Sequence, residues 1–134
     1  MINCGIIGFG KMGQIRAKAL EITGRVKVLS VFEESSLPND VVYSNVRNAG
    51  YIINNPQIGA VFICTPNYLN KPLTIQALNA GKHVFCEKPP AFNSQEVEEI
   101  IAVEKQSVKK LMYGFNHRHH ESIRHIKKLI FYTD

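Results

Sequence analysis

The stretch GFGKMG, residues 8–13, has the glycine spacing G-x-G-x-x-G. It follows INCGIIG, an apolar run typical of a buried strand, and it opens KMGQIRAKALEI, which has a helical pattern. A glycine pattern alone is weak support for a function, because any tight turn uses glycine. Between a strand and a helix, however, it is the fingerprint of a dinucleotide-binding turn. The helical pattern rests on apolar residues at helical spacing, which are Met12, Ile15, Ala19 and Ile22.

Each glycine of this turn has a separate expected role. Gly8 permits the tight turn, Gly10 lets a pyrophosphate approach the backbone, and Gly13 lets the helix pack closely on the strand. The helix N-terminus adds unpaired N–H groups and a partial positive charge. The alternative is a purely structural turn. We expect the cofactor to contact Gly8, Phe9, Gly10, Lys11, Met12 and Gly13.

Strand-like runs and helical patterns alternate along the rest of the chain. The runs VKVLSVF, VVYS, GAVFICT, KHVFC and KLMYGF are typical of strands. Helices are expected in NKPLTIQALNAG, after a capping-box-like start at Asn93 and Glu96, and in ESIRHIKKLI. Parallel strands need crossover connections, which are usually helices. The alternation therefore predicts a single α/β domain with a doubly wound parallel sheet, the Rossmann dinucleotide-binding fold.

Ligands of such sheets bind beyond the carboxyl ends of the strands. Glu33 ends the second strand, twenty residues after Gly13, where an acid accepts hydrogen bonds from the adenine ribose hydroxyls. Its charge would repel a 2′-phosphate, and the adjacent Glu34 adds to it, so NAD is favoured over NADP. The alternative is that either acid is a solvated loop residue. The strand ends that we expect on one rim are Gly8, Glu33, Thr65, Glu87 and Phe115.

Composition limits the other classes of protein. The 134 residues suffice for one domain, and no signal peptide or membrane-length apolar run is present, so we expect a cytoplasmic protein without a membrane partner. Cys4, Cys64 and Cys86 lie in strand-like runs and lack metal-ligand spacing, which favours buried free thiols. The formal charge of +5 is concentrated after residue 100. This basic tail lacks a nucleic-acid-binding motif, and its histidines lack zinc-site spacing, so we expect a solvated helix and no metal site.

Further motifs carry a resemblance to a known family. CTPN at 64–67, AGKHVFCEKP at 80–89 and GFNHR at 114–118 follow the glycine turn and Glu33 in order. Together these segments resemble the N-terminal domain of the Gfo/Idh/MocA family of oxidoreductases, from residue 1 to about residue 130. The EKP that follows an apolar strand is the most specific of them.

The resemblance implies roles for two charged residues near the nicotinamide. Lys88 would reach the substrate hydroxyl as a general acid/base or orienting group, and Glu87 would lie near the nicotinamide ribose. A cis Lys88-Pro89 bond would aim the lysine inward. The alternative is an exposed loop lysine that pairs with its neighbour.

The same resemblance implies that Thr65, Pro66 and Asn67 border the nicotinamide half of the cofactor and that Arg118 faces the substrate. As alternatives, the first three form an ordinary turn and Arg118 is a surface charge on a linker.

Three features depart from the family pattern. The crossover after the second strand is short, so its helix is reduced to a loop. Asn70 and Arg16 stand where many members have histidine. The family's second domain has no counterpart in the chain. We therefore divide the chain into a dinucleotide-binding domain, residues 1–118, and a linker helix, residues 119–134.

The leading hypothesis is the NAD-binding half of an oxidoreductase that moves a hydride between a nicotinamide cofactor and a sugar, sugar nucleotide or polyol hydroxyl. We expect this chain alone to be inactive and the full-length protein to be a homo-oligomer. The alternatives are a non-catalytic NAD-binding sensor or regulatory module, and an interaction protein that uses the basic tail. The last helix should pack partly on this domain, and pair with another copy at high concentration, through Ile123, Ile126, Leu129 and Ile130.

Overall fold

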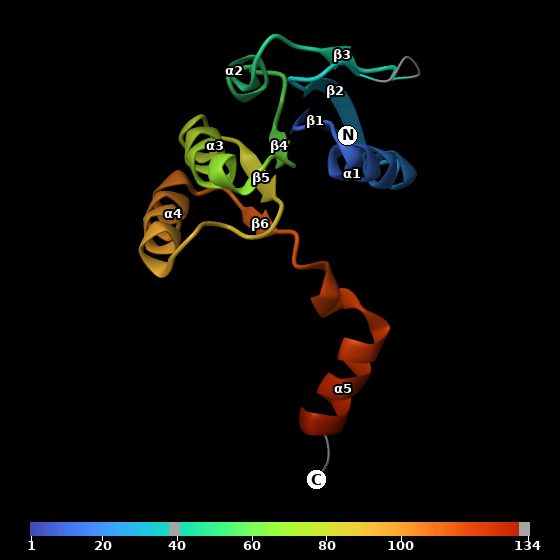
Figure 1. The fold of residues 1–134 in the computed structure, drawn as a ribbon, viewed down its shortest axis with the longest axis vertical. Helices are drawn as coiled ribbons and strands as arrows, with labels where there is room; N and C mark the ends of the chain where they lie inside the picture. Colours follow the sequence, from blue (N-terminus) through green and yellow to red (C-terminus); the bar gives the residue numbers. More distant parts are fainter. Residues whose placement is uncertain (38–40, 132–134) are drawn as a thin grey trace.

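The computed structural model describes residues 1–37 and 41–131, so the end of the polar stretch EESSLPND lies outside the described residues. Six parallel strands form one sheet in the order β3-β2-β1-β4-β5-β6, which confirms the doubly wound α/β fold (Figure 1). The strands are β1 Ile2–Ile7, β2 Val26–Phe32, β3 Ser44–Asn45, β4 Ala60–Ile63, β5 His83–Cys86 and β6 Leu111–Tyr113. The helices are α1 Lys11–Ile22, α2 Ala49–Ile53, α3 Asn67–Asn79, α4 Ser94–Ser107, the 3-10 helix η1 Asn116–His119 and α5 Glu121–Phe131.

Apolar side chains fill both faces of the sheet. On one face, α2 and α3 bury a core that includes Ile52, Val61, Ile63 and Leu78. On the other face, α1 covers a smaller core around Ile6 and the neighbouring strands. Because helices cover both faces of the sheet, the strands are continuous apolar runs and do not alternate between apolar and polar residues.

Helix α1 has the predicted bounds but not the predicted apolar face. Its buried residues are Gly13 and Ala17, whereas Ile15 is 45% exposed and Ile22 is 78% exposed. A Cβ on Gly13 would overlap the carbonyl oxygen of Gly8. This close contact sets the rotation of the helix, so positions 13 and 17 face the sheet and Ile15 and Ile22 turn outward.

Two further predictions from the sequence agree with the structure, one for the connection between β2 and β3 and one for the start of α4. Among the described residues between β2 and β3 there is no helix, as the short crossover predicted. At the start of α4, the side chain of Asn93 accepts a hydrogen bond from the Glu96 N–H at 2.9 Å. The Glu96 carboxylate accepts from the N–H of Phe92, also at 2.9 Å, and so caps the residue before Asn93.

Helix α5 extends away from the sheet (Figure 1), so the prediction that it packs partly on this domain is wrong. All its residues from Glu121 to Ile130 are exposed. The amphipathic pattern predicts that α5 has an apolar face, but the pattern holds no information on which surface covers that face. No helix within the described residues is long and apolar enough to cross a membrane.

Val108, at the end of α4, has a left-handed backbone with φ of 52° and is 87% exposed. A β-branched residue is unfavourable there, by about 1 to 2 kcal/mol, because its Cβ crowds the following carbonyl. Val108→Asn should therefore raise the free energy of unfolding by about 1 kcal/mol in urea denaturation. Val42, equally exposed at 87% but without positive φ, is the matched control. Val42→Asn should not stabilise the chain, and an equal gain from both variants would contradict the prediction.

Candidate cofactor and substrate site

The carboxyl ends of the parallel strands share one rim of the sheet. The glycine turn follows β1, Glu33 follows β2, Thr65 comes shortly after β4, Glu87 follows β5 and Gly114 follows β6. The strand order changes direction between β1 and its neighbours β2 and β4, and such a switch point is where ligands bind in open α/β sheets. The predicted site residues are thus gathered along one edge from segments far apart in sequence.

The glycine turn has little room for side chains at two of its glycines. Gly8 has φ of +85°, and a Cβ there would lie 2.5 Å from the carbonyl oxygen of Cys64. At Gly13 the backbone of the turn occupies the space, as described above. A Cβ on Gly10 would meet no atom within 4 Å. The turn therefore closes against β4 on one side and leaves open space at Gly10, which is the geometry that a pyrophosphate needs.

Glu33 is bound to the same turn. Its Oε2 accepts a hydrogen bond from the Phe9 N–H at 2.7 Å, and its Oε1 accepts from the Ser35 N–H at 3.3 Å. The Phe9 side chain is buried and packs edge-on against Tyr43, with ring centroids 5.5 Å apart. The acid is therefore held at the turn. Glu34 is exposed, as expected of a loop acid.

Asn45, which the sequence analysis did not single out, fixes the backbone of Glu33. Its Oδ1 accepts from the Glu33 N–H at 3.1 Å, and its Nδ2 donates to the Glu33 carbonyl at 3.3 Å. This double contact depends on the parallel pairing of β2 with β3, in which Val31 lies opposite Asn45. Only that register could have revealed the residue.

The remaining predicted cofactor-binding residues lie at the start of α1 and between β4 and α3. Lys11 is exposed and Met12 is half-buried at the start of α1. Pro66 and Asn67 are exposed at the start of α3, and the Thr65 hydroxyl donates to Asn70 Oδ1 at 3.3 Å.

Asn70 is fully buried on α3 and holds the loop after β5. Its Nδ2 donates to the carbonyl of Glu87 at 3.1 Å and to the carbonyl of Pro89 at 2.8 Å. The Lys88-Pro89 peptide bond within this loop is cis. One amide thus fixes both sides of Lys88.

Glu87 is 8% exposed and pairs with Arg16 of α1, with Nη2 to Oε1 at 2.6 Å. No ion pair within the described residues involves Lys88, so Lys88 does not pair with its neighbour. Lys88 is exposed at a cavity of about 330 Å³. The cavity is lined by Lys88, Gly114, Phe115, Asn116, His117 and Arg118. The structure therefore brings together the two residues expected to face the substrate.

Within the described residues, neither the cysteine thiols nor a cluster of metal-binding side chains forms a competing site. Burial raises the pKa of the thiols of Cys4, Cys64 and Cys86 to about 12, so they are protonated at neutral pH and poor nucleophiles. Within residues 1–37 and 41–131, no group of three His, Cys, Asp or Glu side chains is placed to hold a metal ion.

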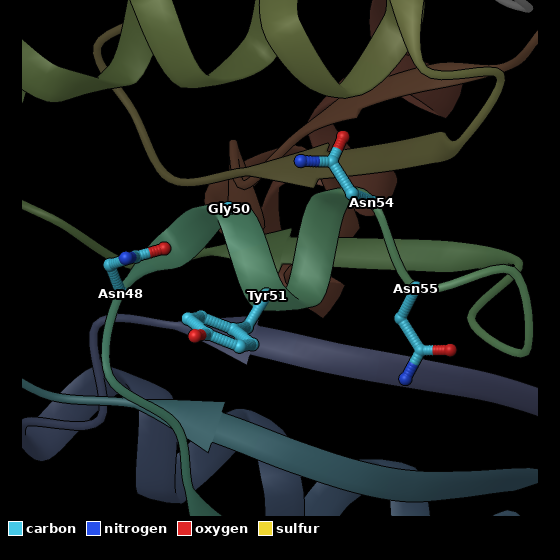
Figure 2. Close-up of a pocket in the computed structure, with 5 residues that line it drawn as sticks. All are labelled: Asn48, Gly50, Tyr51, Asn54 and Asn55. Atoms are coloured by element: carbon cyan, nitrogen blue, oxygen red, sulfur yellow. The ribbon is translucent and has the colours of Figure 1, made fainter.

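A second cavity, of about 520 Å³, lies on α2 and is lined by Asn48, Gly50, Tyr51, Asn54 and Asn55 (Figure 2). Its lining has amides and one phenol but no carboxylate, amine, imidazole or thiol. This chemistry offers hydrogen bonds without an acid, a base or a charge to orient a reaction. The rim, with its glycine turn and charged groups, is therefore the candidate functional site.

A parallel sheet of this strand order, with a glycine turn between its first strand and first helix, defines a dinucleotide-binding Rossmann domain. More particularly, the chain belongs to the Gfo/Idh/MocA family, described as the oxidoreductase family with an NAD-binding Rossmann fold, whose sequence pattern matches residues 2–115. The resemblance drawn from the sequence motifs is confirmed.

Comparison with individual proteins agrees with this family. The chain is 29% identical to inositol 2-dehydrogenase from Rhizobium meliloti over 133 residues, which cover 96% of this chain and 40% of that protein. The structure of an NAD-binding protein from Listeria innocua superimposes with a TM-score of 0.87 and 30% identity, over 96% of this chain and 39% of that one. Biliverdin reductase from Synechocystis, in complex with biliverdin and NADP+, shares the fold with a TM-score of 0.88 and 24% identity, over 96% of this chain and 42% of that one. The chain spans 34–41% of the length of the curated relatives it matches.

Gly114 offers a test of how tightly the rim is packed. A Cβ there would lie 2.7 Å from Glu87 Oε2 and 3.2 Å from the Phe85 ring, too close for an unstrained contact. We expect Gly114→Ala to lower the free energy of unfolding by about 1 to 3 kcal/mol in urea, the usual effect of overpacking. Gly59 is the matched control, because a Cβ there meets its nearest atom at 3.9 Å. If Gly114→Ala were as mild as Gly59→Ala, the described position of the Glu87 carboxylate would be wrong.

Proposed function

We propose that this chain is the NAD-binding part of an oxidoreductase that transfers a hydride between a nicotinamide cofactor and a hydroxyl of a sugar, sugar nucleotide or polyol. The observation that carries the proposal is that Lys88 and Arg118 line one cavity on the rim that holds the glycine turn and Glu33. Residues 1–118 form the cofactor domain in this proposal, and residues 119–134, which include α5 (Glu121–Phe131), form the linker that leads to a substrate domain.

The residues of the rim fit a dinucleotide. The open space at Gly10 and the N-terminus of α1 suit the pyrophosphate, and Glu33 suits the hydroxyls of the adenine ribose. Thr65, Pro66, Asn67 and Glu87 would border the nicotinamide half. When bound, the cofactor supplies the hydride acceptor or donor.

The chain's own contribution to the chemistry is a proton relay and an orienting charge. Lys88 Nζ would exchange a proton with the reacting hydroxyl, because that oxygen loses a proton when its carbon loses a hydride and gains a proton when its carbon gains a hydride. Arg118, which lines the same cavity, would donate hydrogen bonds that orient the substrate. Glu87 is already paired with Arg16, and no acid within the described residues forms an ion pair with Lys88.

The proposal includes NAD in preference to NADP. Both cofactors suit this fold, since the Synechocystis relative holds NADP+. In this chain the carboxylate of Glu33 stands at the turn, where a 2′-phosphate about 4 Å away would be repelled by about 4 kcal/mol at an effective dielectric constant near 20. Solvent reduces this to roughly 3 kcal/mol, or about 100-fold in affinity.

Isothermal titration of the 134-residue chain tests the preference directly. We expect NAD to bind about 100-fold more tightly than NADP, and Glu33→Ala to narrow that ratio to less than about tenfold. Glu34→Ala is the matched control, because it removes the same charge from an exposed neighbour and should change the ratio little. Equal affinities for both cofactors in the unaltered chain would remove Glu33 from this role.

The role of Lys88 is tested in a protein that carries this domain together with a substrate domain. Lys88→Ala should lower kcat by about 10² to 10⁴-fold, the usual loss of general acid/base help, and leave the Kd of NAD unchanged. Lys27→Ala, which removes an exposed lysine on β2, is the control. A normal kcat for Lys88→Ala would show that Lys88 is only a loop charge.

A further inference from the structure

The side chain of Arg16 links three segments that meet at the rim. From α1, its Nε donates to Glu87 Oε1 at 2.7 Å and its Nη2 donates to Asn116 Oδ1 at 3.2 Å. The guanidinium carbon lies 4.8 Å from the centre of the Phe85 ring, within the range of a cation–π contact. One side chain therefore joins the cofactor helix to the ends of β5 and β6.

The Glu87 carboxylate is confined by these neighbours. The side chains of Arg16 and Glu87 are only 17% and 11% exposed, so their charges are poorly screened by solvent. Both contacts of Arg16 with Glu87 reach the same oxygen, Oε1. The other oxygen, Oε2, lies against Gly114 and accepts no hydrogen bond from any residue in 1–37 or 41–131. One oxygen of Glu87 is thus bound by protein, and the other retains its capacity to accept a donor.

The backbone of Glu87 is fixed as well. Asn70 holds its carbonyl, and its N–H donates to the carbonyl of Ile63 at 2.9 Å. With the backbone fixed on both sides, only the side-chain torsions can redirect the carboxylate. Arg16 is the residue that fixes those torsions, because its Nε donates a hydrogen bond to Oε1 and its Nη2 forms an ion pair with the same oxygen.

We propose that Arg16 is a positioning residue of the cofactor site, which aims Glu87 Oε2 at a hydroxyl of the second ribose and anchors Asn116 beside it. This inference rests on the proposed function, because it takes the second ribose to be that of NAD. Without Arg16, the carboxylate is free to turn toward Lys88 or solvent. The adenine half of the cofactor, held by Gly10 and Glu33, would not be affected.

Three nucleotides distinguish binding of the adenine half from binding of the second ribose and the nicotinamide. ADP contains only the adenine half, ADP-ribose adds the second ribose, and NAD adds the nicotinamide. In calorimetry on the 134-residue chain, Arg16→Gln should weaken the binding of ADP-ribose and of NAD about tenfold, which is the effect of one lost hydrogen bond to a charged group. The affinity for ADP should not change. The affinities of Arg16→Lys for ADP-ribose and NAD should lie between those of the unaltered chain and those of Arg16→Gln. A lysine keeps the charge but lacks the planar guanidinium that reaches both Glu87 and Asn116. Lys18→Gln, the same loss of charge on an exposed position of α1, is the matched control.

The pattern across the nucleotides decides the outcome. If Arg16→Gln lost affinity equally for all three nucleotides, the variant would have a general structural defect. If it lost no affinity for any of them, Arg16 would not aim Glu87. Either result overturns the inference. Glu87→Gln removes the charge that Arg16 binds and should reproduce the selective loss, with little further loss in the double variant. If Arg16→Gln does not fold, a uniform loss from Glu87→Gln overturns the inference by itself. Failure of the unaltered chain to bind any of the three would overturn the proposed function as well.

Discussion

The close contact between the backbone at Gly13 and the carbonyl of Gly8 sets most of the geometry of this domain. A helix that touches its strand at that point has one allowed rotation, which buries Gly13 and Ala17 and turns Ile15 outward. Arg16 lies three residues after Gly13, next to this contact face, and so reaches the segments that follow β5 and β6. The contact thus fixes the cofactor turn and the ion pair at once.

Two asparagine amides, the exposed one of Asn45 and the fully buried one of Asn70, hold backbone segments at the rim. Asn45 holds Glu33 after β2, and Asn70 holds the loop that contains Lys88 after β5. An amide carries both a donor and an acceptor and no charge, so it can satisfy two backbone groups without the cost of burying an ion. The backbones at Glu33 and on both sides of Lys88 are therefore fixed by uncharged side chains.

The fold could be predicted because its signals are local. Continuous apolar runs mark buried parallel strands, and the glycine spacing marks the turn, so α1 and β2 have the predicted bounds. The parts that could not be predicted depend on register and rotation. Asn45 meets Glu33 only through the pairing of β2 with β3, and Arg16 meets Glu87 across 71 residues of sequence. The outward face of α1 and the exposed α5 were mispredicted for the same reason, since periodicity identifies a face but not its partner.

The α1 face of the sheet shows why Arg16 occupies its position. Phe62 and Phe85 stack there with ring centroids 5.2 Å apart, and Met112 on the outer strand β6 is 52% exposed. Within the described residues, α1 is the helix that packs on this face, and its core lies over β1 and β2. The guanidinium of Arg16 covers Phe85 at the edge of that core, where its flat, weakly hydrated surface can lie on an aromatic ring while its N–H groups bind Glu87. A lysine could supply the charge but could not lie flat on the Phe85 ring. Arg16 therefore both covers Phe85 at the edge of that core and binds Glu87 at the rim.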